Sequence, residues 1–317
     1  MNMPKSILNP LEYYACHGLM TNPKEYGILF EGLPTEISAL CQVVQGVLIH
    51  IFWAERLGVR LSEERKREVN IRQIARKLAG IRKMSDQPLT VARPLEKRLV
   101  GNCRDFSTML CAMLRHQHVP SRARCGFATY FGAGKYEDHW VCEYWKASQR
   151  RWMMVDAQLD SFQRRVLQIK FDPCDMPSSY FLPAGKAWQL CRAGQVDPDR
   201  FGIFDMHGIG FIQGNLLRDM ASLNKMELLP WDGWGLIEKE QKALSADDIA
   251  LLDYIAALTL GDNNMFHEMR STYENNPRLR VPSVVRSYTA TGVQTIKIAD
   301  EDEAAQVNND PKNCSRF

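Results

Sequence analysis

Three residues of the sequence have the side chains of a nucleophile, a base and an acid that orients the base: Cys103, His139 and Asp156. A thiol attacks well only as a thiolate, which a helix N-terminus and a neighbouring imidazolium both favour. A carboxylate bonded to the imidazole fixes its tautomer and leaves the other ring nitrogen for the sulfur. Together the three residue types predict attack on a carbonyl carbon and a covalent intermediate.

The segment around Cys103 predicts a helix that carries the thiol in its first turn. Apolar residues recur at three-and-four spacing from Phe106 to Leu114, and Pro120 lies just past the end. We expect this helix to begin at about Asn102, so that the N–H groups of its first turn face the thiol and can hold an oxyanion. Further candidates for contact with the substrate or the oxyanion are Asn102, Arg104 and Trp140.

His139 and Asp156 lie on two segments that are predicted to be neighbouring strands. Residues 139–145 alternate between two faces, and residues 152–159 are rich in β-forming side chains. In an antiparallel hairpin of these strands, His139 lies directly across from Asp156 or diagonal to it, within hydrogen-bonding reach. Another strand is predicted over 121–131.

Residues 99–160 resemble the transglutaminase-like superfamily in three pieces, GNCRDFSTMLCAMLRHQHVPSRARCGF, DHWVCEYW and RWMMVDAQLD. The resemblance implies that Cys103 is the nucleophile, His139 the general base and acid, and Asp156 its orienting residue. It also implies a structural role for Arg122. The implied fold is α+β, a papain-like transglutaminase core in which the nucleophile helix packs on a small antiparallel sheet, with additional helices before and after.

Two positions depart from the pattern of that superfamily. His118 stands where Gly is usual, so we expect this histidine to take a left-handed conformation at the helix end. Asp156 is followed by Ala157 and Gln158 rather than Pro and Thr, which leaves the turn after the carboxylate open.

The residues before the thiol helix predict two more helices. The apolar segment 37–57 predicts one long, largely buried helix that ends at Gly58. Ser62, followed by two glutamates, predicts the N-cap of a second helix that ends at Gly80.

The second half of the chain carries fewer signals. Residues 208–220 predict a loop entering a helix, and Ser245 predicts the N-cap of a helix that ends near Gly261. We expect four parts: an N-terminal helical part of the core (1–98), the transglutaminase-like catalytic core (99–170), a C-terminal extension that shapes the cleft (171–299) and a disordered tail (300–317).

Composition and charge are those of an ordinary globular protein. Hydrophobic residues make up 45% and charged residues 24%, and the net charge of +3 gives no argument for a nucleic-acid or membrane partner. No apolar run reaches the length of a membrane helix, about 18 residues, and residues 1–14 lack the apolar region of a signal peptide. The nine cysteines have no paired spacing, so we expect a reducing, cytoplasmic environment.

Hydrolysis of an amide or peptide bond through a thioester on Cys103 is the reaction that we favour for this sequence. Two alternatives stay open. One is acyl transfer onto an amine in a small-molecule pathway, with a carrier as one source of the acyl group. The other is a scaffold without catalytic activity.

The expected substrate is a peptide or small molecule that bears an amide or acyl group. Basic residues outnumber acidic ones over 56–104, which suits a solvated helix face and also suits docking of an acidic partner. No cofactor and no metal is expected, because His116, His118 and Cys125 lack the spacing of metal ligands.

Overall fold

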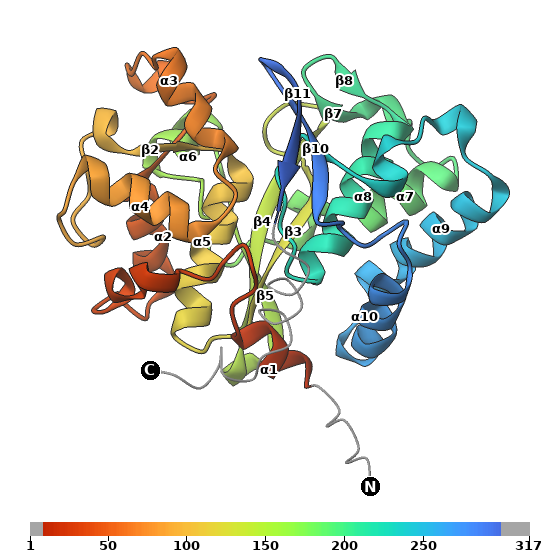
Figure 1. Ribbon diagram of the computed structural model, residues 1–317, viewed down its shortest axis with the longest axis horizontal. Coiled ribbons are helices and arrows are strands. Elements are labelled where there is room, and N and C mark those ends of the chain that lie inside the picture. The colour runs from red at the N-terminus through yellow and green to blue at the C-terminus, as the bar shows by residue number, and fades with distance from the viewer. Residues whose placement is uncertain (1–8, 299–317) are drawn as a thin grey trace, which may run out of the picture.

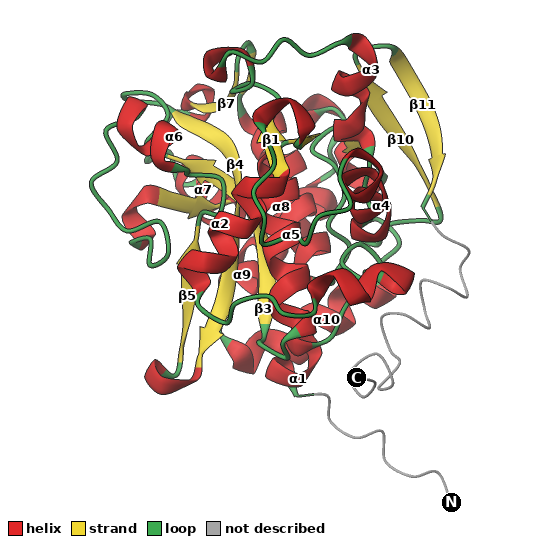
Figure 2. Ribbon diagram, turned by 90° about the vertical axis from the view of Figure 1, so that its left-hand side faces the viewer, coloured by secondary structure: helices red, strands yellow, loops and turns green. Residues whose placement is uncertain are grey.

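The computed structural model describes residues 9–298 and has an α+β fold in which a mixed six-stranded sheet stands between two groups of helices (Figure 1). One group contains α2 (Ile37–Val47), α4 (Ile74–Met84) and α5 (Cys103–His116). The other contains α7 (Ala184–Arg192), α8 (Ile209–Leu223), α9 (Ala246–Leu260) and α10 (Phe266–Asn275). The first group faces the viewer in Figure 2. The short helices are α1 (Pro10–Ala15), α3 (Glu63–Lys66) and α6 (Ser161–Val166).

The central sheet has the order β6-β3-β4-β7-β8, with β5 also paired to β4. Its strands are β3 (Ser121–Ala128), β4 (Tyr136–Lys146), β5 (Arg151–Val155), β6 (Phe181–Pro183), β7 (Phe201–Ile203) and β8 (Met206–His207). Strand β4 is antiparallel to both β3 and β5, and Cys142 pairs with Val155. Asp156, the next residue after β5, therefore lies diagonal to His139 on the same side of the sheet.

Two small sheets flank the central one. Strands β1 (Leu48–His50) and β2 (Leu99–Gly101) are parallel, with His50 paired to Gly101. Strands β9 (Asp232–Gly233), β10 (Val284–Thr289) and β11 (Gly292–Lys297) form an antiparallel sheet. Because α5 begins two residues after β2 ends, the carboxyl end of β1 lies beside the first turn of that helix.

Helix α5 begins where a reciprocal cap is available. Oδ1 of Asn102 accepts a hydrogen bond from the N–H of Asp105, and Oδ2 of Asp105 accepts one from the N–H of Asn102. The buried Asp105 carboxylate also pairs with Lys77 at 2.9 Å and with Arg104 at 2.9 Å. These contacts fix the start of α5, and with it the position of the thiol.

The predicted helix over 37–57 is wrong beyond its first half. Helix α2 ends at Val47, and the next residues form β1, whose partner β2 lies about fifty residues further along the chain. The predicted helix from Ser62 to Gly80 is also interrupted. Ser62 does cap a helix, but α3 is short, and α4 begins at Ile74 and continues through Gly80 to Met84.

Other local predictions are confirmed. His118 has φ 57°, in the left-handed region. Ser245 caps α9 through a reciprocal bond with Asp248, and Gly261 follows its last residue. Helix α8 begins directly after Gly208. The predicted disordered tail, 300–317, lies outside the described residues.

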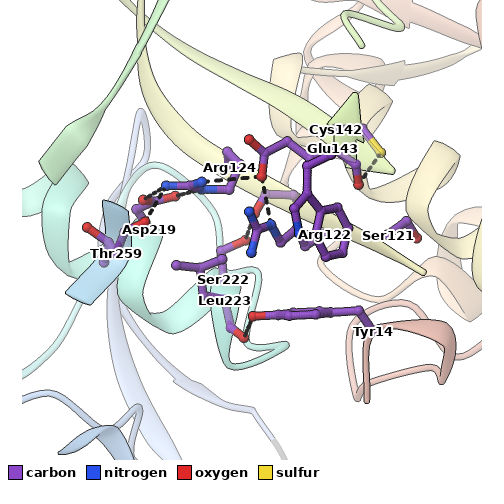
Figure 3. A network of polar contacts seen from close by, with 12 residues as sticks. Tyr14, Ser121, Arg122, Arg124, Cys142, Glu143, Asp219, Ser222, Leu223 and Thr259 are labelled. Atoms are coloured by element: carbon purple, nitrogen blue, oxygen red, sulfur yellow. Dashed lines mark hydrogen bonds and ion pairs between the residues drawn. The ribbon is translucent and has the colours of Figure 1, made fainter. Parts of the chain in front are cut away.

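A buried network of charges joins the central sheet to the second helix group (Figure 3). Arg124 on β3 binds both carboxylate oxygens of Asp219 on α8, at 3.0 and 2.8 Å, and donates to the carbonyl oxygen of Thr259 at 2.9 Å. Glu143 accepts from Arg124 and from Arg122 at 3.3 and 2.6 Å. Arg122, for which the sequence suggested a structural role, also lies 4.1 Å from the centre of the Trp152 ring.

Candidate active site

A cavity of about 970 Å³ opens at the first turn of α5. Its polar wall includes His50, Asn102, Cys103, Asp138, His139, Gln158 and Arg218. Its aromatic wall includes Phe52, Trp53, Phe131, Phe204, Phe211 and Trp231. A concave site with many apolar walls and a few polar groups is the usual form of a small-molecule or peptide binding site.

The Cys103 side chain is 8% exposed and lies on the wall of this cavity. Burial and the Asp138 carboxylate raise the pKa of the thiol, whereas the backbone N–H groups of Trp140 and Arg104 lower it. Burial dominates, so the pKa of Cys103 lies well above its ordinary value. The sequence favoured a thiolate at this position, whereas burial favours the protonated thiol, which needs a base before it can attack.

The raised pKa of Cys103 makes its alkylation strongly dependent on pH. A thiol with a raised pKa has less thiolate at pH 7 than a free cysteine, whose pKa is about 8.5. We therefore expect the rate of alkylation by iodoacetamide, followed by intact mass, to keep rising above pH 8.5. Asp138→Asn removes a negative charge that opposes the thiolate, so it should move the profile to lower pH.

The matched control for this pH profile is Asp205→Asn, which removes another carboxylate from the cavity wall. This control should leave the profile near that of the unmodified protein. A wild-type rate that is already at its plateau at pH 7 would show that the thiol pKa is low rather than raised.

His139 and Asp156 meet as their diagonal positions require. Nε2 of His139 lies 2.9 Å from Oδ2 of Asp156, and each residue is 1% exposed. Oδ2 also accepts from the hydroxyl of Tyr130 at 2.5 Å, and Oδ1 accepts from the N–H of Gln158 at 2.9 Å. Burial alone raises the pKa of Asp156, but His139 and these hydrogen bonds outweigh it and leave the pKa below its usual value.

The ionised Asp156 carboxylate decides the tautomer of His139. Because a carboxylate only accepts, Nε2 carries the proton and Nδ1 is left as an acceptor. The rings of Tyr130 and Phe131 meet the imidazole edge to face, with centroids 5.9 and 5.0 Å away, and hold its orientation. Among the described residues Nδ1 makes no hydrogen bond, to the Cys103 sulfur or to any other atom, and catalytic hydrogen bonds often tighten only with substrate bound.

The structure thus joins two of the three residues by a hydrogen bond and places Cys103 on the same cavity wall as His139. The other candidates are placed differently. Asn102 lines the cavity, but its Nδ2 is buried without a partner. The Arg104 guanidinium points away, to the carbonyl oxygen of Glu227 and to Asp105, and the Trp140 indole is buried in the core beside α5.

Sequence reasoning missed several groups around the three candidate residues. Tyr130 follows β3 in a loop, where nothing in its spacing marked it as a partner of Asp156. His50 was assigned to the middle of a helix. The carboxylate of Asp138 accepts from Asn215 on α8 at 2.7 Å, a contact between segments far apart in the sequence. In the sequence, Asp138 is marked only by its position directly before His139.

Part of the basic stretch 56–104 is buried. Lys77 and Arg104 are fully buried and paired with Asp105.

Within the part of the chain that the structure describes, no group of three or more His, Cys, Asp or Glu side chains is placed to hold a metal ion. No helix in residues 9–298 is long and apolar enough to cross a bilayer.

Comparison with known proteins gives one family for this part of the chain. Residues 54–157, which include Cys103, His139 and Asp156, match the family model of the transglutaminase-like superfamily. Over this segment the chain is similar to that superfamily, whose members generally carry out amide or acyl chemistry that depends on a cysteine. No curated protein and no solved structure gave a significant match.

Proposed function

We propose that this protein is an enzyme that hydrolyses an amide or peptide bond through a thioester on Cys103. The observation that carries the proposal is the 2.9 Å contact between His139 and Asp156, on the wall of a cavity that the thiol also lines. A buried carboxylate bonded to one nitrogen of an imidazole leaves the other nitrogen ready to accept a proton.

Each step of the proposed reaction uses one of these groups. Nδ1 of His139 takes the thiol proton as the Cys103 sulfur bonds to the carbonyl carbon, and the carbonyl oxygen becomes an oxyanion. The Asp156 carboxylate stabilises the imidazolium. His139 then gives its proton to the leaving nitrogen as the C–N bond breaks, which leaves a thioester. A water molecule, deprotonated by His139, attacks the thioester and releases the acid and the free thiol.

The cavity supports a substrate that presents an apolar group next to its carbonyl carbon. The rings of Phe52 and Phe204 meet edge to face with centroids 5.0 Å apart, and both line the cavity. Aromatic walls of this kind favour burial of apolar substrate surface. We therefore propose a peptide or small molecule whose acyl side is apolar.

The direct test is acylation of the protein by p-nitrophenyl acetate, followed by intact mass analysis. We expect an adduct with the mass of one acetyl group on the wild type and its loss in Cys103→Ala. Cys111→Ala is the matched control because Cys111 lies on the same helix, fully buried, with its sulfur 3.4 Å from that of Cys142. This control should acylate like the wild type.

The fate of the acetyl group separates hydrolysis from acyl transfer. Hydrolysis predicts that the adduct decays in water at a rate that added glycine ethyl ester does not change. Acyl transfer predicts faster decay and an amide product when this amine is present. An adduct that persists in Cys103→Ala would overturn the proposed nucleophile.

A further inference from the structure

His50 lies at the carboxyl end of β1, beside the nucleophile, and has no part in the reaction proposed above. It pairs with Gly101, which precedes Asn102 and Cys103, and it lines the same cavity as Cys103 and His139. Its ring packs against those of Phe52 and Phe106, with centroids 5.6 and 6.2 Å away, so its orientation is fixed. The parallel pairing of β1 with β2 thus delivers a rigid imidazole to the reaction centre.

The hydrogen bonds of His50 define its protonation. The backbone N–H of Phe52 donates to Nδ1 of His50 at 3.2 Å, so Nδ1 is an acceptor and carries no proton. Burial and the neighbouring His139 lower the pKa of His50 to about 3, so the ring is neutral at any pH above that value. A neutral imidazole that accepts at Nδ1 carries its proton at Nε2.

Nε2 of His50 is a donor without a partner. It makes no hydrogen bond with the described residues, but it is not sealed from solvent. By contrast, Nδ2 of Asn102 and Nε1 of Trp140 have neither a hydrogen-bond partner nor contact with solvent. Since His50 and Cys103 line the same cavity, this open nitrogen is available to a carbonyl group bonded to the Cys103 sulfur.

We propose that His50 is a catalytic residue that donates its Nε2–H to the oxyanion formed when Cys103 attacks the substrate carbonyl. This inference rests on the proposed function. No proton changes place in this contact; the hydrogen bond strengthens as the carbonyl oxygen gains charge and weakens as the thioester forms. The backbone N–H of Arg104, in the first turn of α5 and beside the sulfur, is the second donor.

Two substitutions separate this role from a structural one. In His50→Asn the side-chain oxygen takes the place of Nδ1, so the bond from Phe52 is kept and the donor at Nε2 is lost. In His50→Gln the amide nitrogen takes the place of Nε2, so the donor is kept and the bond from Phe52 is lost. A structural role predicts that His50→Asn is the milder change, and an oxyanion donor predicts the reverse.

Acylation by p-nitrophenyl acetate reports on the oxyanion, whereas alkylation by iodoacetamide forms none. We expect His50→Asn to lower kcat for acylation by about 10²- to 10³-fold with little change in KM. His50→Gln should stay within about 10-fold of the wild type. Both variants should keep the wild-type rate of alkylation at Cys103.

The control is His17→Gln, which alters a buried histidine outside the cavity whose pKa burial also lowers to about 3. It should acylate like the wild type. Equal acylation rates in the wild type and His50→Asn, at equal alkylation rates, would refute the role of His50 alone. Failure of the wild type to form an adduct on Cys103 would instead refute the proposed function, so the two failures are distinct.

Discussion

Asp156→Asn is expected to lower kcat/KM for hydrolysis by about 10³- to 10⁴-fold while the protein stays folded. The carboxylate accepts from His139, Tyr130 and the N–H of Gln158. An asparagine has one oxygen for these donors, so its NH₂ group faces either the N–H of Gln158 or both His139 and Tyr130. When the NH₂ group faces Nε2 of His139, it donates to this nitrogen and so stabilises the tautomer with the proton on Nδ1. In that tautomer Nδ1 is unable to take the proton of the thiol.

The measurement is steady-state hydrolysis of a p-nitrophenyl ester, with circular dichroism to verify the fold. Asp160→Asn is the matched control, because this carboxylate caps α6 by accepting from the N–H of Gln163 and contacts none of the three site residues. A loss of less than about 10-fold in Asp156→Asn would show that orientation of the imidazole does not depend on this carboxylate.

Asp219→Ala is expected to lower the free energy of unfolding by about 3–5 kcal/mol, because it leaves a buried guanidinium without its main counterion. Asp219 is fully buried and binds Arg124 through both oxygens, and one of these oxygens also accepts from the N–H of Cys125. Asp219 and Glu143 together raise the pKa of Arg124, which therefore remains charged when the partner is removed. The remaining contacts, to Glu143 and Thr259, satisfy only part of that charge.

Urea denaturation followed by tryptophan fluorescence measures this loss. Asp175→Ala is the control, since Asp175 pairs with Arg151 at 3.0 Å but both side chains are nearly half exposed. Exposed pairs contribute about 0–1 kcal/mol, so this variant should unfold close to the wild type. Similar losses in the two variants would mean that the buried network adds nothing beyond an ordinary surface ion pair.

The part of the site that sequence reasoning could reach depends on local periodicity. The three-and-four spacing behind Cys103 predicted where α5 begins, and strand alternation placed His139 and Asp156 where a hydrogen bond joins them. Both patterns repeat within a few residues, so they are visible in the sequence. The catalytic roles of these residues remain a prediction until the variants are tested.

The part that sequence reasoning could not reach depends on pairing between distant segments. The apolar residues 37–57 suit a buried helix and a buried strand equally well, and only β2 decides that residues 48–50 are extended. His50 was hidden for this reason. The high pKa of Cys103 was hidden as well, because burial and the position of Asp138 are known only once the chain has folded.

The walls of the cavity come from an earlier part of the chain, residues 50–167, and a later part, residues 203–288. The sulfur, the imidazole and the acid lie within residues 54–157, whereas residues 203–238 and Tyr288 supply much of the remaining lining. Chemistry and selectivity are therefore encoded in different places. A designer who wishes to change which molecule is accepted can vary the later stretch, for example at Phe204 or Trp231, and keep the reacting atoms as they are.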